Sequence, residues 1–344
     1  MWVFAGRSGR VRICDPHVRN VHAGKDSLLG LTLVTGASGF IGSHLLKEMA
    51  QRGLPVRGVS QRNRSGLVTI SSYESSLDWR DYLSNVDSVV HLAARVHVMR
   101  ETAENPLAAF RAANVDATLN LARQAANAGV RRFVFVSTIK VNGEQTEPDR
   151  PFRHIDTPNP QDPYAVSKAE AEAGLLALGQ ITGMEIVIIR PPLVYGPGVG
   201  GNFRNLMKWA SSGLPSIFSE VQNRRSLLFV GNLCDLIIET LGHPQAANNI
   251  LLASDGPAFS THELLLNLAA AYGRELGSIR LPSSLLRTLG ILAFRRHAME
   301  RLLNNLELDS TATRERLAWA CPFDSRTGLS ASVRDDAAIL RVNS

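Results

Sequence analysis

The sequence of 344 residues contains only three cysteines, and it has no long apolar run. Cys14, Cys234 and Cys321 are odd in number and far apart, which argues against a disulfide framework and against a zinc site. We therefore expect no metal and a reducing, cytoplasmic location. No apolar run reaches the roughly 18–20 residues that cross a bilayer, so a membrane-spanning protein is not expected.

The chain also lacks a strong charge bias. Its formal net charge is +6, and residues 1–28 hold five basic and two acidic side chains, so they supply half of that charge. The body is thus only mildly basic, and we expect no nucleic-acid partner. The apolar stretch in residues 1–28 is too short for a signal peptide, so this segment is an extension with no assigned role.

What the sequence does have is an alternation of short apolar runs and helical periods from Leu31 onward. We expect strands near 31–34, 54–60, 86–94, 131–138 and 185–191, with helices near 41–53, 114–129 and 165–183. Strands that alternate with helices of this length predict an α/β protein with a Rossmann-type, doubly wound parallel sheet.

The regular alternation of strands and helices ends after Pro197, where Gly- and Asn-rich sequence precedes further helical segments. We expect a dinucleotide-binding domain over 29–197 and a smaller C-terminal substrate-binding lobe over 198–335. Within that lobe, 226–255 is a candidate to rejoin the first domain.

A glycine-rich turn, TGASGFIG, lies between the first expected strand and helix. Gly36, Gly39 and Gly42 allow the backbone to approach a pyrophosphate, and the helix N-terminus offers N–H donors to it. Its G-x-x-G-x-x-G spacing differs from the G-x-G-x-x-G of ordinary dinucleotide sites. The expected cofactor contacts in this turn are Gly36, Ser38, Gly39, Phe40, Ile41 and Gly42.

The end of the second expected strand bears on which dinucleotide binds. An acidic residue there holds the ribose of NAD, whereas an arginine accommodates the 2′-phosphate of NADP. This chain has Ser60, Gln61, Arg62 and Arg64 and no acid in that stretch. The pattern favours NADP, with Arg62 on the phosphate, and leaves NAD open.

Tyr164 and Lys168 are four residues apart, on one face of an expected helix. An ammonium beside a phenol favours the phenolate and lowers the pKa of the tyrosine. Tyr164 would then serve as a general acid or base for interconverting an alcohol and a ketone. The stretch VSTIKVNG upstream offers Thr138 or Ser137 to hold the reacting hydroxyl.

Together these motifs resemble the extended short-chain dehydrogenase/reductase family, in its nucleotide-sugar epimerase/dehydratase branch. The resemblance also covers HLAA at 91–94, Asn114, RPPLVYGPG at 190–198 and RRSLLFV at 224–230. It implies that Thr138, Tyr164 and Lys168 are catalytic, and that Tyr164 and Lys168 also border the cofactor. It further implies cofactor contacts at Leu92, Ala93 and Ala94, and substrate contacts at Thr138, Asn202 and Arg225.

The resemblance implies an NAD(P)-dependent oxidoreductase or epimerase acting at C4 of a UDP-activated hexose. UDP-glucose 4-epimerase-like enzymes of bacterial surface-polysaccharide synthesis (O-antigen or capsule) are the leading interpretation. An NADPH-dependent UDP-4-keto-6-deoxy-hexosamine 4-reductase is the alternative. A small-carbonyl reductase or a non-catalytic dinucleotide-binding protein is the second alternative.

Two departures from the family pattern follow Thr138. Sugar 4,6-dehydratases carry Asp-Glu there, whereas this chain has Ile139 and Lys140, which cannot supply the acid and the base that dehydration needs. A dehydratase is therefore disfavoured. The second departure is Asn142, which stands where the family usually has tyrosine.

The stretch PSSLLRTLGILAFRR, residues 282–296, is amphipathic and basic at its end. We interpret it as a core or dimer-packing helix, in keeping with an expected homodimer. Peripheral proximity to a membrane is the alternative.

Overall fold

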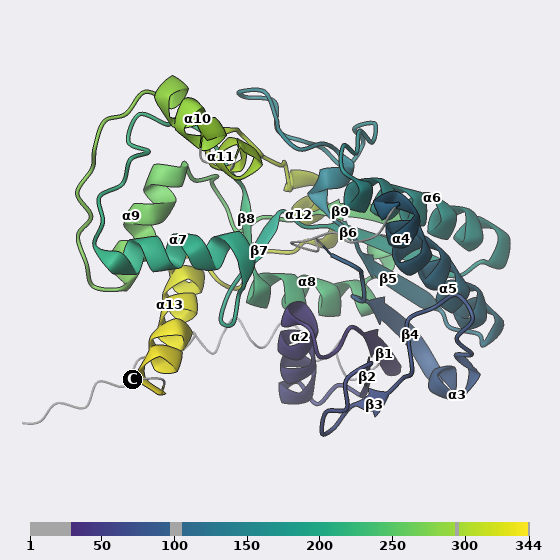
Figure 1. The fold of residues 1–344 in the computed structure, drawn as a ribbon. Coiled ribbons are helices and arrows are strands. Elements are labelled where there is room, and N and C mark those ends of the chain that lie inside the picture. The colour runs from purple at the N-terminus through teal and green to yellow at the C-terminus, as the bar shows by residue number, and fades with distance from the viewer. Residues whose placement is uncertain (1–28, 97–104, 293–295, 343–344) are drawn as a thin grey trace, which may run out of the picture.

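A seven-stranded parallel sheet forms the centre of the computed structural model, which describes residues 29–96, 105–292 and 296–342. The strand order is β3-β2-β1-β4-β5-β6-β9 (Figure 1), and each neighbouring pair is parallel. The predicted doubly wound α/β fold is confirmed. The strands are β1 (Leu31–Thr35), β2 (Val56–Ser60), β3 (Val68–Thr69), β4 (Val86–His91), β5 (Arg132–Val136), β6 (Glu185–Arg190) and β9 (Asn249–Leu252).

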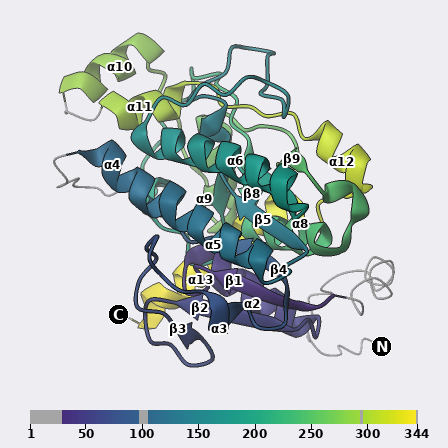
Figure 2. The same cartoon turned by 90° about the vertical axis from the view of Figure 1, so that its right-hand side faces the viewer.

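Helices cover both faces of this sheet because successive strand side chains point to opposite faces. Val34 and the strand side chains on the same face of the sheet pack toward α2 (Phe40–Gln51) and α8 (Val230–Gly242). Leu33 and the strand side chains on the opposite face pack toward α5 (Ala117–Asn127) and α6 (Pro163–Thr182). These two helices lie in front of the sheet in Figure 2. Helix α3 (Arg80–Leu83) is a single turn before β4.

The segment before α5 differs from the expected single helix over 114–129. Helix α4 (Pro106–Arg111) begins earlier, because the Asn105 side chain accepts a hydrogen bond from the Ala108 N–H and proline occupies the first helical position. A π-helical turn, η2 (Ala112–Asp116), then joins α4 to α5. Such turns are frequent at functional sites, and this one holds Asn114.

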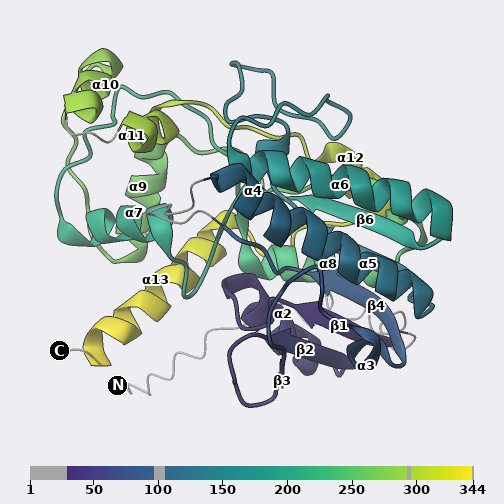
Figure 3. The ribbon, with the colours of Figure 1, turned by 45° about the vertical axis from the view of Figure 1, so that its right-hand side comes forward.

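The chain beyond Pro197 forms most of a second lobe, to the left of the sheet in Figure 1. A two-stranded parallel sheet of β7 (Leu193–Tyr195) and β8 (Leu227–Phe229) links the two parts. Strand β9 and helix α8 return to the main sheet, and Figure 3 shows α8 beside that sheet. The other helices are η4 (Pro244–Ala246), α7 (Gly201–Ser212), α9 (Thr261–Ala271), α10 (Ser283–Leu292), α11 (Arg296–Leu303), α12 (Thr311–Leu317) and α13 (Ser325–Val342).

The predicted amphipathic stretch 282–296 corresponds to α10 and the start of α11. Helix α10 buries Leu286, whereas Leu285, Leu289 and Ile291 are exposed. Among the described residues, no helix is both long and apolar enough to span a membrane. The extension 1–28 lies outside the described residues.

Candidate active site

The predicted site residues of the first domain gather at the carboxyl ends of β1, β4 and β5. This edge is where open α/β sheets bind their ligands. The glycine turn follows β1, Leu92 to Ala94 follow β4, and Thr138 follows β5. Lys168, on α6, reaches the same edge, because its Nζ donates to the Val136 carbonyl oxygen at 2.8 Å.

The glycine turn has a shape that side chains would fill. Gly36 has φ 66°, and a Cβ there would lie 2.8 Å from the Ala93 nitrogen. A Cβ on Gly42 would lie 2.8 Å from the Ala37 Cα and closer still to the Gly36 carbonyl oxygen. Phe40 and Ile41 are the first two residues of helix α2, which has no side-chain cap and no acidic residue in its first turn. Its first N–H groups therefore suit a phosphate.

Two hydroxyl groups that sequence reasoning missed hold this edge together. The Thr35 hydroxyl accepts hydrogen bonds from the N–H groups of Leu92 (3.2 Å) and Ala93 (3.3 Å). The Tyr73 hydroxyl accepts one from the Gly36 N–H at 2.9 Å and donates to the Val59 carbonyl oxygen at 3.2 Å. No motif in the sequence marks Tyr73, because its contacts depend on tertiary packing.

The end of β2 carries a serine where an acid would hold a ribose. The Ser60 hydroxyl donates to Ser38 Oγ at 2.7 Å and accepts from the Arg62 N–H at 3.1 Å. Arg62 and Arg64 are exposed in the loop that follows. Two exposed cations next to the glycine turn are compatible with a 2′-phosphate.

His91, at the end of β4, is part of the support for the site. Its Nδ1 lies 2.7 Å from Thr35 Oγ1 and its Nε2 lies 2.9 Å from Thr118 Oγ1. The ring stacks on Phe135 with a centroid separation of 5.8 Å. Burial, helped by the charge of Lys168, lowers the pKa of His91 to about 3, so the imidazole stays neutral.

Thr138 and Ser137 place two hydroxyl groups just after β5. The Thr138 hydroxyl caps a short 3-10 helix, η3 (Ile139–Val141), by accepting from the Lys140 N–H at 3.3 Å. The Ser137 hydroxyl is buried, and within the described chain it has no hydrogen-bond partner. A buried hydroxyl without a partner is costly, so it points to a polar ligand atom at this position.

Tyr164 lies in the first turn of α6 and is half-buried. Its ring packs edge-on against Phe110, with ring centroids 6.2 Å apart. Lys168, one turn further on, is buried, and its Nζ lies 3.8 Å from the centroid of the Phe135 ring. Lys168 thus reaches the end of β5, next to Thr138, from the same helix that carries Tyr164.

The expected lowering of the Tyr164 pKa is wrong for this structure. Burial raises the pKa of Tyr164 to about 12, and the charge of Asp162 adds to this effect. Burial also lowers the pKa of Lys168 to about 7, although the charge of Glu172 opposes the shift. Burial and the Asp162 carboxylate both disfavour the phenolate, so the Tyr164 phenol stays protonated at neutral pH.

Asn142, the residue that departs from the family pattern, has a structural role here. Its Oδ1 accepts from the Arg190 guanidinium at 2.9 Å, and its Nδ2 donates to the Arg153 carbonyl oxygen at 3.1 Å. Arg190 also forms a buried ion pair with Glu172. Asn142 therefore ties the loop beside the site to β6 and α6.

Asn114 makes a comparable connection from η2. Its Nδ2 donates to the Arg95 carbonyl oxygen and to Ser167 Oγ, both at 3.0 Å, and its Oδ1 accepts from the Arg95 N–H at 2.7 Å. These bonds join the segment after β4 to α6.

Arg225, the predicted substrate contact, lies just before β8, where its backbone pairs with Phe259. Its guanidinium donates to the Asn304 carbonyl oxygen at 3.0 Å. Burial lowers the pKa of Arg225 to about 10, and the charge of Arg301 on α11 adds to this effect. Within the described chain no carboxylate pairs with Arg225, so its buried guanidinium suits an anionic ligand.

Asn202, the other predicted substrate contact, is exposed in the first turn of α7. In the described part of the chain, no hydrogen bond joins it to Arg225 or to the sheet edge. Sequence reasoning missed Arg301 on α11, because no motif marks it.

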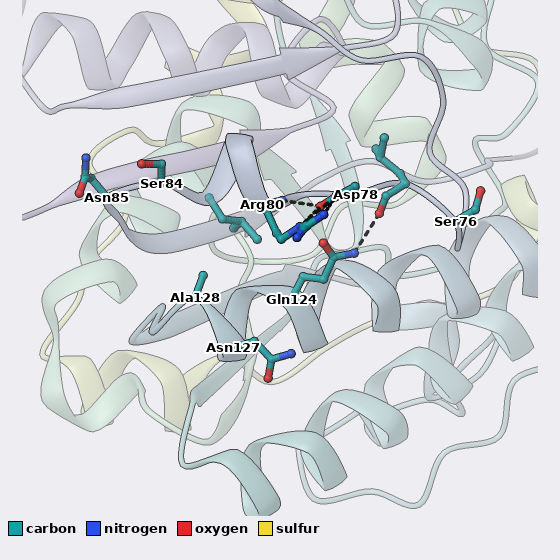
Figure 4. A pocket seen from close by; sticks show the side chains of 10 residues that line it. Ser76, Asp78, Arg80, Ser84, Asn85, Gln124, Asn127 and Ala128 are labelled. Carbon is teal, nitrogen blue, oxygen red and sulfur yellow. Dashed lines mark hydrogen bonds and ion pairs between the residues drawn. The ribbon is translucent and has the colours of Figure 1, made fainter.

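A hollow of about 540 Å³ lies elsewhere, at the amino-terminal edge of the sheet (Figure 4). Several of its polar side chains already have protein partners. Asp78 pairs with Arg80, and Gln124 donates to the Leu77 carbonyl oxygen. It is therefore a poorer candidate than the carboxyl edge. No three His, Cys, Asp or Glu side chains gather as a metal site among the residues described.

The comparisons with known proteins agree with this geometry. The model of the NAD dependent epimerase/dehydratase family matches residues 32–252. A UDP-glucose 4-epimerase of Vibrio cholerae is 40% identical over 302 residues, which cover 86% of this chain and 92% of that protein.

Two solved structures share the fold. The crystal structure of UDP-glucose 4-epimerase from Thermotoga maritima with UDP-glucose has a TM-score of 0.72 at 22% identity, covering 90% of this chain and 99% of that one. The structure of RMD from Pseudomonas aeruginosa with NADPH has a TM-score of 0.68 at 22% identity, with the same coverage.

Proposed function

We propose that this chain, which belongs to the NAD-dependent epimerase/dehydratase family, is an enzyme that oxidises or reduces C4 of a UDP-activated hexose. The observation that carries the proposal is the convergence on one sheet edge of two sets of groups. One is a glycine cradle for a pyrophosphate, and the other is a set of side chains suited to an alcohol. The Vibrio cholerae relative, a UDP-glucose 4-epimerase, supports this substrate class.

The backbone of Gly36, Gly39 and Gly42 would hold the dinucleotide, and Lys168 would border its ribose. A bound nicotinamide supplies hydride chemistry. Thr138 would hydrogen-bond the C4 oxygen of the sugar, and the unpartnered hydroxyl of Ser137 would contribute a second bond.

Tyr164 would give a proton to that oxygen or remove one from it. With a pKa raised to about 12, its phenol is protonated at neutral pH and is ready to donate. Arg225 and Arg301 would hold the diphosphate of the nucleotide sugar, because the charge of Arg301 lies close enough to lower the pKa of the buried Arg225 guanidinium.

Three observations favour a 4-keto reductase as the second candidate within this chemistry. A serine stands at the end of β2, where an acidic residue would hold the ribose of NAD. Exposed Arg62 in the following loop suits the 2′-phosphate of NADPH. A cofactor held less tightly can exchange at every turnover, as a reductase requires. A protonated Tyr164 also suits reduction of a ketone.

The cellular setting that we propose is bacterial surface-polysaccharide sugar synthesis in the cytoplasm, by a homodimer. The exposed apolar side chains of α10 support an additional contact, either with a second copy or peripherally with a membrane. Two free thiols, Cys234 and Cys321, are compatible with a reducing compartment.

The test is incubation of the enzyme with UDP-glucose, UDP-N-acetylglucosamine and 4-keto UDP-sugars, with and without NADPH. Turnover without added coenzyme indicates an epimerase, and stoichiometric loss of NADPH with a keto sugar indicates a reductase. Tyr164→Phe should abolish turnover and leave cofactor binding unchanged, because it removes only the transferable proton. Turnover that survives this substitution would contradict the assigned role.

A further inference from the structure

We infer that Lys140 and Asp162 form a positioning pair that joins the segment bearing Thr138 to the helix bearing Tyr164 and balances the charge beside the phenol. The inference rests on the proposed function of this site. Lys140 Nζ lies 2.5 Å from Asp162 Oδ2 and 2.9 Å from Glu144 Oε1. The Lys140 and Asp162 side chains are 23% and 16% exposed, which limits screening by solvent.

Both members of the pair belong to helix starts that flank the site. Asp162 caps α6, because its Oδ1 accepts from the Ala165 N–H at 2.6 Å. Lys140 lies in η3, where its own N–H donates to the Thr138 hydroxyl. The ion pair thus connects the cap of the helix that carries Tyr164 to the turn that Thr138 caps.

Such a connection has a chemical purpose if Thr138 and Tyr164 address the same oxygen atom. Reaction at one oxygen needs both hydroxyl groups held within a fraction of an ångström. The two residues come from different elements, since Thr138 follows β5 and Tyr164 lies on α6, and helix termini are places where chains fray. A mostly buried ion pair across the two segments restrains that motion.

The pair also controls charge near the reacting phenol. Asp162 is two residues before Tyr164, and its carboxylate adds to the rise of the Tyr164 pKa. Lys140 places a cation on that same carboxylate and so offsets it. The pair therefore keeps a capping oxygen on the catalytic helix at a smaller electrostatic cost to the phenolate.

Other charged groups surround Tyr164 and act as a constant background. Lys168 lies one turn along α6, and Glu144 contacts Lys140 from the loop side. On the side of α4, Arg95 lies over the Phe110 ring, and Arg111 pairs with Glu170. His91, behind Lys168, is buried and neutral. Substitution at Lys140 or Asp162 leaves the charges of these groups in place, and only Glu144 loses a contact when Lys140 is replaced.

The test uses two substitutions that should move the Tyr164 pKa in opposite directions. Asp162→Asn keeps a good N-cap and removes the negative charge, so the pKa should fall. Lys140→Met removes the cation and leaves the carboxylate, so the pKa should rise. Each shift should be about one pH unit, which is a roughly tenfold change in the phenolate fraction at a fixed pH.

The shift is measured without substrate from the 13C signal of the tyrosine ring carbon that bears the hydroxyl. Tyr164→Phe identifies the Tyr164 signal among the five tyrosines. The pH profile of kcat, measured on whichever UDP-sugar the wild-type enzyme turns over, should move in the same directions. Lys140→Arg should restore the wild-type value.

Glu147→Gln is the matched control, since Glu147 forms an exposed ion pair with Arg150 in the same loop and should leave the titration unchanged. Shifts in one common direction, or none in either variant, would overturn the inference, because a purely structural role lowers kcat without opposed pKa shifts. The proposed function fails separately, if the wild-type protein turns over no UDP-hexose.

Discussion

The two parts of the site differ in the atoms that they offer a ligand. At the sheet edge, the expected pyrophosphate contacts are backbone N–H groups in a turn that runs directly from β1 into α2. In the C-terminal lobe, the expected diphosphate contacts are side chains. Arg225 precedes β8, and Arg301 lies on α11, far along the chain.

This difference predicts different sensitivities to substitution. A backbone cradle tolerates most side-chain changes, but it fails wherever a Cβ enters space that the turn itself occupies. A side-chain site loses affinity in proportion to the charged groups removed, and the fold is little affected. The substitutions below test this contrast in order of expected effect.

Gly42→Ala should have the largest effect, because its Cβ would meet the backbone of Gly36 and Ala37 at the start of α2. Neither the Gly36 carbonyl oxygen nor the Ala37 Cα can move without opening the turn, so we expect the free energy of unfolding to fall by about 1–3 kcal/mol. Cofactor affinity should fall on the order of 100-fold, because a misplaced turn no longer presents its N–H groups correctly. Thermal unfolding and a fluorescence titration with NADPH and NAD measure the two losses.

Gly200→Ala is the control for this prediction. Gly200 has a negative φ of −106°, and a Cβ there meets nothing within 4 Å. The Gly200→Ala variant should bind the cofactor with the wild-type affinity. If Gly42→Ala also bound normally, the cradle would not be the cofactor site.

Arg225→Met should have the next largest effect, confined to the nucleotide sugar. Removing a hydrogen bond to a charged group costs about 1.5–3 kcal/mol, which corresponds to a roughly 10- to 100-fold rise in KM. Cofactor affinity should not change. Steady-state kinetics with the active UDP-sugar and a separate cofactor titration distinguish the two sites.

The adjacent residue provides the matched control. Arg224 is exposed and pairs with Glu307, so Arg224→Met removes one positive charge from the same segment without touching the proposed anion site. Its KM should stay within about twofold of wild type, as is usual for exposed ion pairs. Equal effects of the two substitutions would mean that general charge, and not Arg225, attracts the substrate.

The backbone cradle is local in the sequence and the side-chain site is not, and this difference explains how much could be predicted from the sequence. The strand-turn-helix unit at the glycines and the spacing of Tyr164 and Lys168 are local, so periodicity and spacing predict where they lie. Strand β3 has only two residues and strand β7 has three, which is too short for a periodicity to register. The early start of α4 depends on a single capping residue, Asn105.

The site contacts that sequence reasoning missed are long-range. Tyr73 reaches the glycine turn through the fold, and Arg301 approaches Arg225 only because α11 packs against the segment before β8. The direction of the Tyr164 pKa was mispredicted for a related reason. Spacing places Lys168 near the phenol, but it does not reveal the burial of both groups or the Val136 carbonyl oxygen that accepts from the amine.

Arg62→Ala should have the smallest effect, and it tests whether the sheet edge relies on side chains at all. Arg62 is exposed in the loop after β2, where water and salt screen its charge. We expect the KM for NADPH to rise roughly two- to fivefold, corresponding to about 0.5–1 kcal/mol, with no change for NADH. The equivalent change at Arg64 separates the two arginines. Equal losses with NADH and NADPH would mean that Arg62 does not contact a 2′-phosphate, and the cradle would then consist of backbone alone.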